Sequence, residues 1–169
     1  MKQKRWDQGL PDSHCKAIDL HVETLSMTIK IIKPDTEEYK QMIDLRISAL
    51  LDPIGVPAHY IVPEKEKDDI LIGAMEGTEM IGCCILTATG KEQVQLRQMA
   101  VRPDQQGKHI GASIVAFAEK TAKENNFNTL TMNARNPVIG FYEKCGYQIT
   151  GNEFYEVGIA HHKMQKNLR

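Results

Sequence analysis

The residues best suited to chemistry in this sequence lie in the stretch VRPDQQGKHIGAS, residues 101–113. An apolar run leads into the stretch and a helical pattern leaves it, so it joins a strand to a helix. Gly107 and Gly111 stand four residues apart, with Ala112 and Ser113 directly after them. A helix N-terminus offers unpaired N–H groups and a partial positive charge, which favour a bound phosphate. The alternative is a tight turn that needs glycine only for its geometry.

The spacing of these small residues excludes the two phosphate loops that are easiest to recognise. A Walker A loop would place glycine at position 102 and serine or threonine at 109, where this chain has Arg102 and His109. A dinucleotide-binding loop has glycines two and then three residues apart, and here they are four apart. A phosphate at this helix would therefore depend on a different arrangement of backbone groups.

The elements that must position this loop follow from hydrophobic periodicity and turn residues. Apolar runs and turns such as EGTE predict strands over residues 28–33, 70–76, 80–89, 94–101, 129–134 and 147–150, and a last strand through VGIAHHKM. Helical spacing predicts helices over residues 37–51, 109–125 and 137–145. Residues 53–69 contain three prolines and a charge run, and predict either a cover over a substrate site or a plain connector. This order indicates a mixed α/β sandwich.

The last of these helices carries clear boundary residues. Asn136 is expected to be its N-cap, Pro137 its first helical residue and Gly146 the residue just past its end. Tyr142 lies inside it, next to other aromatic residues.

The composition is that of an ordinary single domain. The chain has 169 residues, of which 41% are hydrophobic and 25% charged, enough for one self-sufficient core. The net charge is −1 and the basic residues form no stripe, so the sequence favours no nucleic acid partner. No apolar run is long enough to span a membrane, and the chain starts with no secretory signal, so no membrane partner is expected.

The cysteines and histidines show no metal-binding spacing. Cys15, Cys83, Cys84 and Cys145 form no CxxC pair, and the six histidines fit neither a zinc finger nor HExxH. Free thiols indicate a reducing compartment, so we expect a cytoplasmic location and no metal. Residues 1–26 precede a natural strand start at Met27, and are expected to form an extension of unknown role.

Two stretches together resemble the GNAT superfamily of N-acetyltransferases. LRQMAVRPDQQGKHIGASI is similar to its acetyl-CoA-binding motif, with Gln106 at the first position, Gly111 at the last and His109 replacing the usual middle glycine. NARNPVIGFYEKCGY, residues 133–147, resembles a later segment in which an asparagine and a short helix close over the cofactor. The likeness implies an N-acetyltransferase domain over residues 27–169.

The resemblance implies the acyl-CoA N-acyltransferase fold. This is an α+β sandwich whose mixed, mostly antiparallel sheet is splayed at the acetyl-CoA site and carries helices on both faces. In the family, backbone groups at the positions of Met99 and Val101 pair with the pantetheine arm, and N–H groups of the loop hold the pyrophosphate. The cofactor-binding residues expected on this basis are Met99, Ala100, Val101, Gln106, Gly107, Lys108, His109, Ile110, Gly111, Ala112, Asn136 and Tyr142. If residue 109 needs a positive φ, the β-carbon of histidine costs about 1 kcal/mol there.

The resemblance also implies a reaction, in which a primary amine attacks the acetyl thioester directly. Tyr142 matches the usual general acid for the leaving thiol, although it also fits a purely structural core position. The histone-modifying branch has a glutamate base where Gln95 stands here, and an amide cannot accept the proton. Glu92, His161 or a chain of waters remain as the base. His161 lies in the tail EVGIAHHKM, which resembles the GIPHxxM ending of one bacterial branch.

Two functions of different classes remain open at this point. The first is acetyl transfer from acetyl-CoA to the amine of a small molecule, a peptide or a protein. The second is a regulatory module that binds acyl-CoA without catalysis, which the missing acid at Gln95 leaves in play. The sequence leaves the oligomeric state open, and the family analogy offers a homodimer through the strands or the tail as one alternative.

Overall fold

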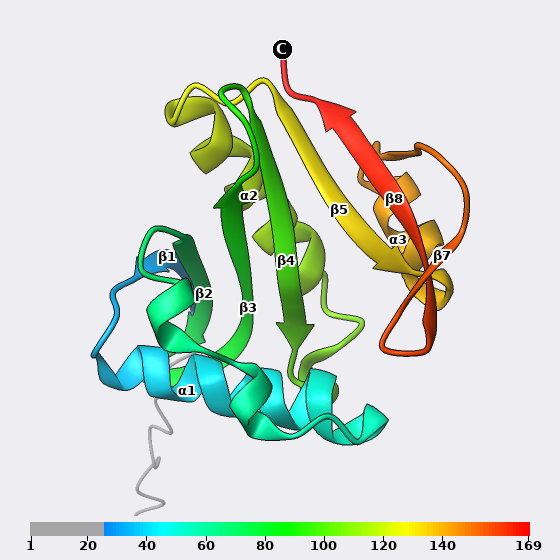
Figure 1. Ribbon diagram of the computed structural model, residues 1–169. Helices are drawn as coiled ribbons and strands as arrows, with labels where there is room; N and C mark the ends of the chain where they lie inside the picture. Colours follow the sequence, from blue (N-terminus) through cyan, green and yellow to red (C-terminus); the bar gives the residue numbers. More distant parts are fainter. Residues whose placement is uncertain (1–25) are drawn as a thin grey trace, which may run out of the picture.

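A mixed sheet of eight strands organises residues 26–169, the part of the chain that the computed structural model describes (Figure 1). The strands are β1 Met27–Ile32, β2 Ile70–Glu76, β3 Glu79–Ala88, β4 Gln93–Val101, β5 Thr129–Arg135, β6 Gln148–Ile149, β7 Phe154–Glu156 and β8 Ile159–Asn167. They lie in the order β1-β2-β3-β4-β5-β8-β6, and β7 also pairs with β8. Among these strands only β4 and β5 pair in parallel, so the predicted mostly antiparallel sheet is confirmed. The extension expected over residues 1–26 lies outside the described residues, apart from Ser26.

Three α-helices accompany the sheet within residues 26–169, together with several shorter turns. The helices are α1 Glu37–Arg46, α2 Ile110–Glu124 and α3 Ile139–Lys144. A π turn over Ile47–Leu51 continues α1, so the first predicted helix reaches its expected length with a change of winding. The segment predicted as a loop or connector contains 3-10 turns at Asp52–Ile54, Ala58–Tyr60 and Pro63–Lys65. No helix in residues 26–169 is both long and apolar enough to cross a membrane.

The first helix begins at a side-chain cap and packs on one face of the sheet. The hydroxyl of Thr36 accepts a hydrogen bond from the Tyr39 N–H at 3.2 Å, and two glutamates follow in the first turn, where the helix dipole favours acids. The apolar side of α1 is buried against β2, β3 and β4 through Tyr39, Met42, Leu45, Leu71, Met75, Met80, Cys83, Ile85 and Ala100. This packing places the end of α1 over the second half of β4, where Arg46 reaches Gln98 and Ala100 joins the core.

The other face of the sheet carries α2 and α3. Their core residues include Ile114, Val115, Ala118 and Tyr142, packed on Leu96 of β4, Met132 of β5 and Met164 of β8. Helices therefore cover both faces, which confirms the predicted sandwich.

The short helix before the last strands differs from the prediction at its start. Residues Asn136–Val138 form a 3-10 turn, and α3 begins only at Ile139. Asn136 does not cap the helix, because its amide donates to Glu153 at 2.7 Å and its oxygen contacts His162 at 2.9 Å. The predicted end is confirmed: Gly146 has φ 89°, with hydrogen bonds from its N–H to Glu143 and from the following N–H to Tyr142.

Candidate active site

The two central strands separate at the place where the sequence predicts a cofactor. β4 and β5 pair only from Gln93 opposite Thr129 to Leu96 opposite Met132, and beyond this point β5 pairs with β8. Figure 1 shows the two strands side by side at their first residues and diverging toward their ends. The last residues of β4 therefore have a neighbour, β3, on one edge, and an open edge toward β5.

A β-bulge in β4 lies at the start of this open edge. Cys83 stands opposite Ala100 and Ile85 opposite Arg97, so two residues of β4, Gln98 and Met99, face one residue of β3. Gln98 adopts a left-handed conformation with φ 47°, which is uncommon for a residue with a β-carbon. A bulge of this kind bends its strand and redirects the side chains that follow.

Backbone direction alternates along β4 and places on the open edge the N–H and carbonyl groups that are expected to pair with the pantetheine arm. The Arg102 N–H donates to the Ile81 carbonyl of β3 at 2.9 Å, so the backbone groups of Val101 point the other way. The Val101 carbonyl accepts a hydrogen bond from the Gln106 amide at 3.2 Å, on the side of the loop. Because backbone direction alternates along a strand, the groups of Met99 face this edge as well.

The loop between β4 and α2 presents a row of unpaired N–H groups. Among residues 26–169 nothing accepts a hydrogen bond from the N–H groups of residues 107–112, which lead into the 15-residue helix α2. The N–H of Gln106 is engaged with the Pro103 carbonyl at 3.4 Å, so the free row begins one residue later than the sequence predicts. Six neighbouring donors at the positive end of a helix fit a pyrophosphate.

His109 and Gly111 each have a separate physical role at the start of α2. His109 has φ 62°, so its β-carbon costs about 1 kcal/mol relative to glycine. Its carbonyl is held by both the N–H and the hydroxyl of Ser113, at 3.0 and 3.1 Å. Gly111 has no positive φ, but a β-carbon there would lie 3.1 Å from the Met99 methyl and 3.3 Å from the Phe141 ring. Glycine at 111 therefore lets α2 approach the bulged strand.

The charged and amide side chains expected near the cofactor are already engaged. The Lys108 ammonium donates to the Gln105 side chain at 2.9 Å. Arg102 is paired with Asp104 at 2.7 Å and with Glu79 at 2.9 Å. Asn136 contacts the residues described above instead of the loop. The structure thus leaves the backbone as the main source of donors at this site.

Tyr142 on α3 meets the bulged strand directly. Its hydroxyl lies 3.4 Å from the sulfur of Met99, and its ring packs edge-on against Phe141 and Tyr147, with centroids 4.9 and 6.1 Å away. Burial raises the pKa of the Tyr142 phenol above its ordinary value, so the hydroxyl keeps its proton at neutral pH. The residue is a core aromatic whose hydroxyl lies beside the open edge.

The two base candidates lie in very different places. Glu92 precedes β4 at its far end, is largely exposed and lies 3.7 Å from Arg169. Met99 is seven positions further along the chain, which corresponds to about 23 Å along an extended strand. The structure does not bring Glu92 to the open edge of β4.

His161 lies on β8, level with the end of β5, and is 6% exposed. It pairs with Arg135, whose neighbour Ala134 belongs to the core under α3, so His161 is on the opposite face of the sheet from Tyr142. Its Nδ1 lies 2.7 Å from the Ile159 carbonyl, which can only accept, so Nδ1 carries the proton and Nε2 has the free lone pair. Nε2 lies 4.0 Å from the Glu156 carboxylate.

Comparison with known proteins identifies this arrangement. Residues 55–168 match the family model described as the acetyltransferase (GNAT) domain. The chain belongs to the GNAT acetyltransferase family. It is an N-acetyltransferase, as the two motifs predict.

Relatives of this GNAT enzyme match most of its length. The uncharacterized N-acetyltransferase YjcF of Bacillus subtilis is 25% identical over 141 residues, which cover 81% of this chain and 98% of that protein. An aminoglycoside 6'-N-acetyltransferase solved with coenzyme A superposes with a TM-score of 0.72 at 17% identity, covering 84% of this chain and 97% of that one. A Bacillus subtilis acetyltransferase solved with CoA has a TM-score of 0.66 at 23% identity, covering 84% of this chain and 99% of that one. The structural likeness confirms the predicted fold.

A buried charged cluster behind the bulge of this acetyltransferase was not predicted from the sequence. Arg46 is fully buried, and binds the carboxylate of Glu66 and the amide oxygen of Gln98. The periodicity of α1 contained a sign of it, because Arg46 follows Tyr39 and Met42 at helical spacing on the apolar side. A charge at a core position of a helix indicates a buried partner.

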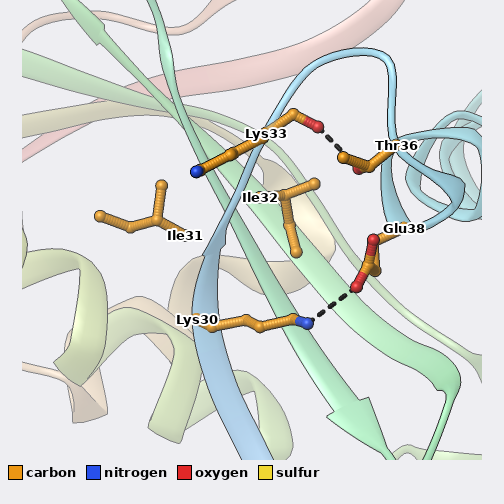
Figure 2. Close-up of a pocket in the computed structure, with 6 residues that line it drawn as sticks. All are labelled: Lys30, Ile31, Ile32, Lys33, Thr36 and Glu38. Atoms are coloured by element: carbon orange, nitrogen blue, oxygen red, sulfur yellow. Dashed lines mark hydrogen bonds and ion pairs between the residues drawn. The ribbon is translucent and has the colours of Figure 1, made fainter.

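A surface hollow at the other edge of the GNAT fold lies away from this site. It is lined by Lys30, Ile31, Ile32, Lys33, Thr36 and Glu38, where β1 passes into α1 (Figure 2). Figure 2 shows its polar groups paired with one another, Lys30 with Glu38 at 2.9 Å and Thr36 with the Lys33 carbonyl at 2.7 Å. We assign this hollow no role in the reaction.

Proposed function

We propose that the chain transfers the acetyl group of acetyl-CoA to a primary amine by direct attack within a ternary complex. The observation that carries this proposal is the free row of N–H groups at residues 107–112, beside the open edge of β4. The Tyr142 hydroxyl lies at the same edge, 3.4 Å from the sulfur of Met99. The structural neighbours solved with coenzyme A support acetyl-CoA as the donor, and the aminoglycoside enzyme among them supports an amine as the acceptor.

Binding of the donor uses mainly the backbone of this chain. The N–H groups of residues 107–112 hold the pyrophosphate, and the backbone of Met99 and Val101 pairs with the pantetheine arm as an added strand would. The bound acetyl-CoA supplies an activated acetyl group as a thioester. To pair fully with the arm, the Val101 carbonyl gives up the hydrogen bond that it accepts from the Gln106 side chain and accepts one from the arm instead.

His161 is the base in this proposal. A lysine-like amine is protonated at pH 7.4, and its neutral form costs about 4 kcal/mol to populate, so a proton acceptor is needed. The free Nε2 lone pair of His161 takes that proton directly or through a water, because Nδ1 is fixed by the Ile159 carbonyl. The carboxylate of Glu156, 4.0 Å away, stabilises the imidazolium that results.

Tyr142 is the acid in this proposal. As the new C–N bond forms and the C–S bond breaks, the phenol gives its proton to the leaving sulfur. The phenol is protonated at neutral pH, and after it has donated its proton the phenolate regains one from solvent. Acid and base approach from opposite faces of the sheet, which separates the thiol side from the amine side.

The second candidate, an acyl-CoA-binding regulatory module without catalysis, is favoured by Gln95. This residue occupies a central position of β4 opposite Thr131, where an amide cannot act as a base. The test is a screen of primary amines with acetyl-CoA, with free CoA thiol as the readout. Release of thiol that depends on an amine supports the enzyme, and CoA binding without any release supports the module. A cytoplasmic location and a homodimer also remain predictions.

A further inference from the structure

Arg46 connects three separate parts of the chain through one buried guanidinium. It stands at the last position of α1 and is 0% exposed. Its two terminal nitrogens donate to the two oxygens of Glu66, one of them at 3.0 Å, and its Nε donates to the Gln98 amide oxygen at 2.6 Å. A guanidinium presents its donors in a fixed plane, so these partners are held in one geometry.

Glu66 brings the segment after α1 into this cluster. It follows the 3-10 turn Pro63–Lys65, and its Oε2 also accepts a hydrogen bond from the Tyr39 hydroxyl at 2.9 Å. Glu66 is 8% exposed, so both hydrogen bonds are shielded from water. The segment that connects α1 to β2 is therefore anchored to the same arginine as the bulge of β4.

Gln98 is the residue that makes the bulge, and its side chain points toward α1. The next residue, Met99, points to the other face, where it packs with the core that contains Tyr142. The left-handed φ of Gln98, 47°, costs on the order of 1 kcal/mol for a residue with a β-carbon. The bond to Arg46 is the side-chain contact that offsets this cost.

We propose that Arg46 is a positioning residue that holds Gln98 in its left-handed conformation and so directs Met99 and the open edge of β4 toward the cofactor. The same arginine also binds Glu66, so the position of residues 61–66 and the direction of the last residues of β4 change together. This inference rests on the proposed function only in calling the open edge a cofactor site. The conformation of the edge itself can be tested without any ligand.

A purely structural ion pair would behave differently. Removing part of a buried charged cluster lowers stability wherever the cluster lies. A positioning role requires in addition that loss of the Gln98 hydrogen bond changes the conformation of β4 and the affinity for CoA. An equally destabilising change elsewhere in the cluster must leave both unchanged. Tyr39 offers this control, because its hydroxyl donates a hydrogen bond to Glu66 and not to Gln98.

The test compares Gln98→Leu, Gln98→Gly and Tyr39→Phe with the wild-type chain. Hydrogen exchange of the amides over residues 97–102 is measured without ligand, and the Kd of CoA by calorimetry. Gln98→Leu keeps the volume but loses the acceptor, and is expected to speed this exchange and weaken CoA binding about tenfold, or 1.4 kcal/mol. Gln98→Gly adopts a positive φ without cost, and is expected to stay within about threefold of wild type. Tyr39→Phe is expected to lower the melting temperature and leave both quantities unchanged.

Two results would overturn the proposal. One is Gln98→Leu exchanging and binding CoA like the wild type. The other is Tyr39→Phe changing both quantities as much as Gln98→Leu does. If the wild-type chain itself binds no CoA, the proposed function fails, and the exchange data alone still decide whether Arg46 positions the bulge.

Discussion

The hydroxyl of Tyr142 lies 3.4 Å from the sulfur of Met99, so α3 contacts the bulged strand β4 at this point. Met99 follows the bulge at Gln98 and also touches the position of Gly111 at the start of α2. The acid candidate, the open strand edge and the phosphate loop are thus held together by one side chain. Predictions about each of them can be tested separately.

Tyr142→Phe is expected to lower kcat about 100-fold, because the leaving sulfur loses its proton donor while the ring packing stays. The Kd of CoA is expected to change little, since the phenol makes no bond to the phosphate loop. Steady-state rates at saturating acetyl-CoA check this for any amine that the screen identifies. An unchanged kcat would remove Tyr142 from the mechanism.

His161→Gln is expected to lower kcat/KM about 100-fold at neutral pH, because the amine loses the acceptor for its proton. His162→Gln is the matched control, since the next residue along β8 points to the other face and contacts Asn136. Glu92→Gln is expected to leave the rate unchanged, because Glu92 lies at the far end of β4. Equal effects of the two histidine substitutions would argue against a specific base at 161.

His109→Gly is expected to stabilise the fold by up to about 1 kcal/mol, because glycine adopts a positive φ without a β-carbon penalty. The greater freedom of glycine in the unfolded chain offsets part of this gain. CoA affinity is expected to stay within about threefold, since the loop binds through backbone N–H groups. Urea unfolding and calorimetry check both quantities, and a large loss of affinity would mean that the imidazole itself touches the ligand.

The stability of the fold is expected to fall as the pH rises from about 10 to about 12. Burial, followed by the hydrogen bond to Glu66, raises the pKa of Tyr39 to about 12. The unfolded phenol titrates near 10, so the stabilising contribution of Tyr39 is complete below pH 10 and is lost as the pH passes its folded pKa. Unfolding free energies of the wild type and of Tyr39→Phe across this range check it. The variant is expected to show the shallower decline, and parallel curves would contradict the assignment.

The order of strands and helices could be predicted from the sequence because periodicity and boundary residues agree along most of the chain. The strand-to-helix loop and the end of α3 at Gly146 lie where their residue types place them. The predicted start of α3 was wrong, because Asn136 makes hydrogen bonds to Glu153 and His162, which are distant in sequence. Local patterns carry no information on such partners.

The candidate site, like the fold, could be predicted only in part from the sequence. The loop and Tyr142 follow from motifs, but the bulge at Gln98 depends on how β3 and β4 pair, which no spacing within β4 reveals. The partner of Arg46 comes from a segment whose sequence shows no regular period. Of the two base candidates, only the three-dimensional structure separates Glu92 from the open edge.

The most direct test of the account is a thermal titration with acetyl-CoA and CoA, with ATP as the control. Ligand at about 100 times its Kd stabilises a fold by roughly 2.7 kcal/mol, a rise of several degrees for a chain of this size. The account predicts this rise with both CoA species and none with ATP. Absence of a rise with CoA, or an equal rise with ATP, would contradict the assignment of residues 107–112 as the pyrophosphate site.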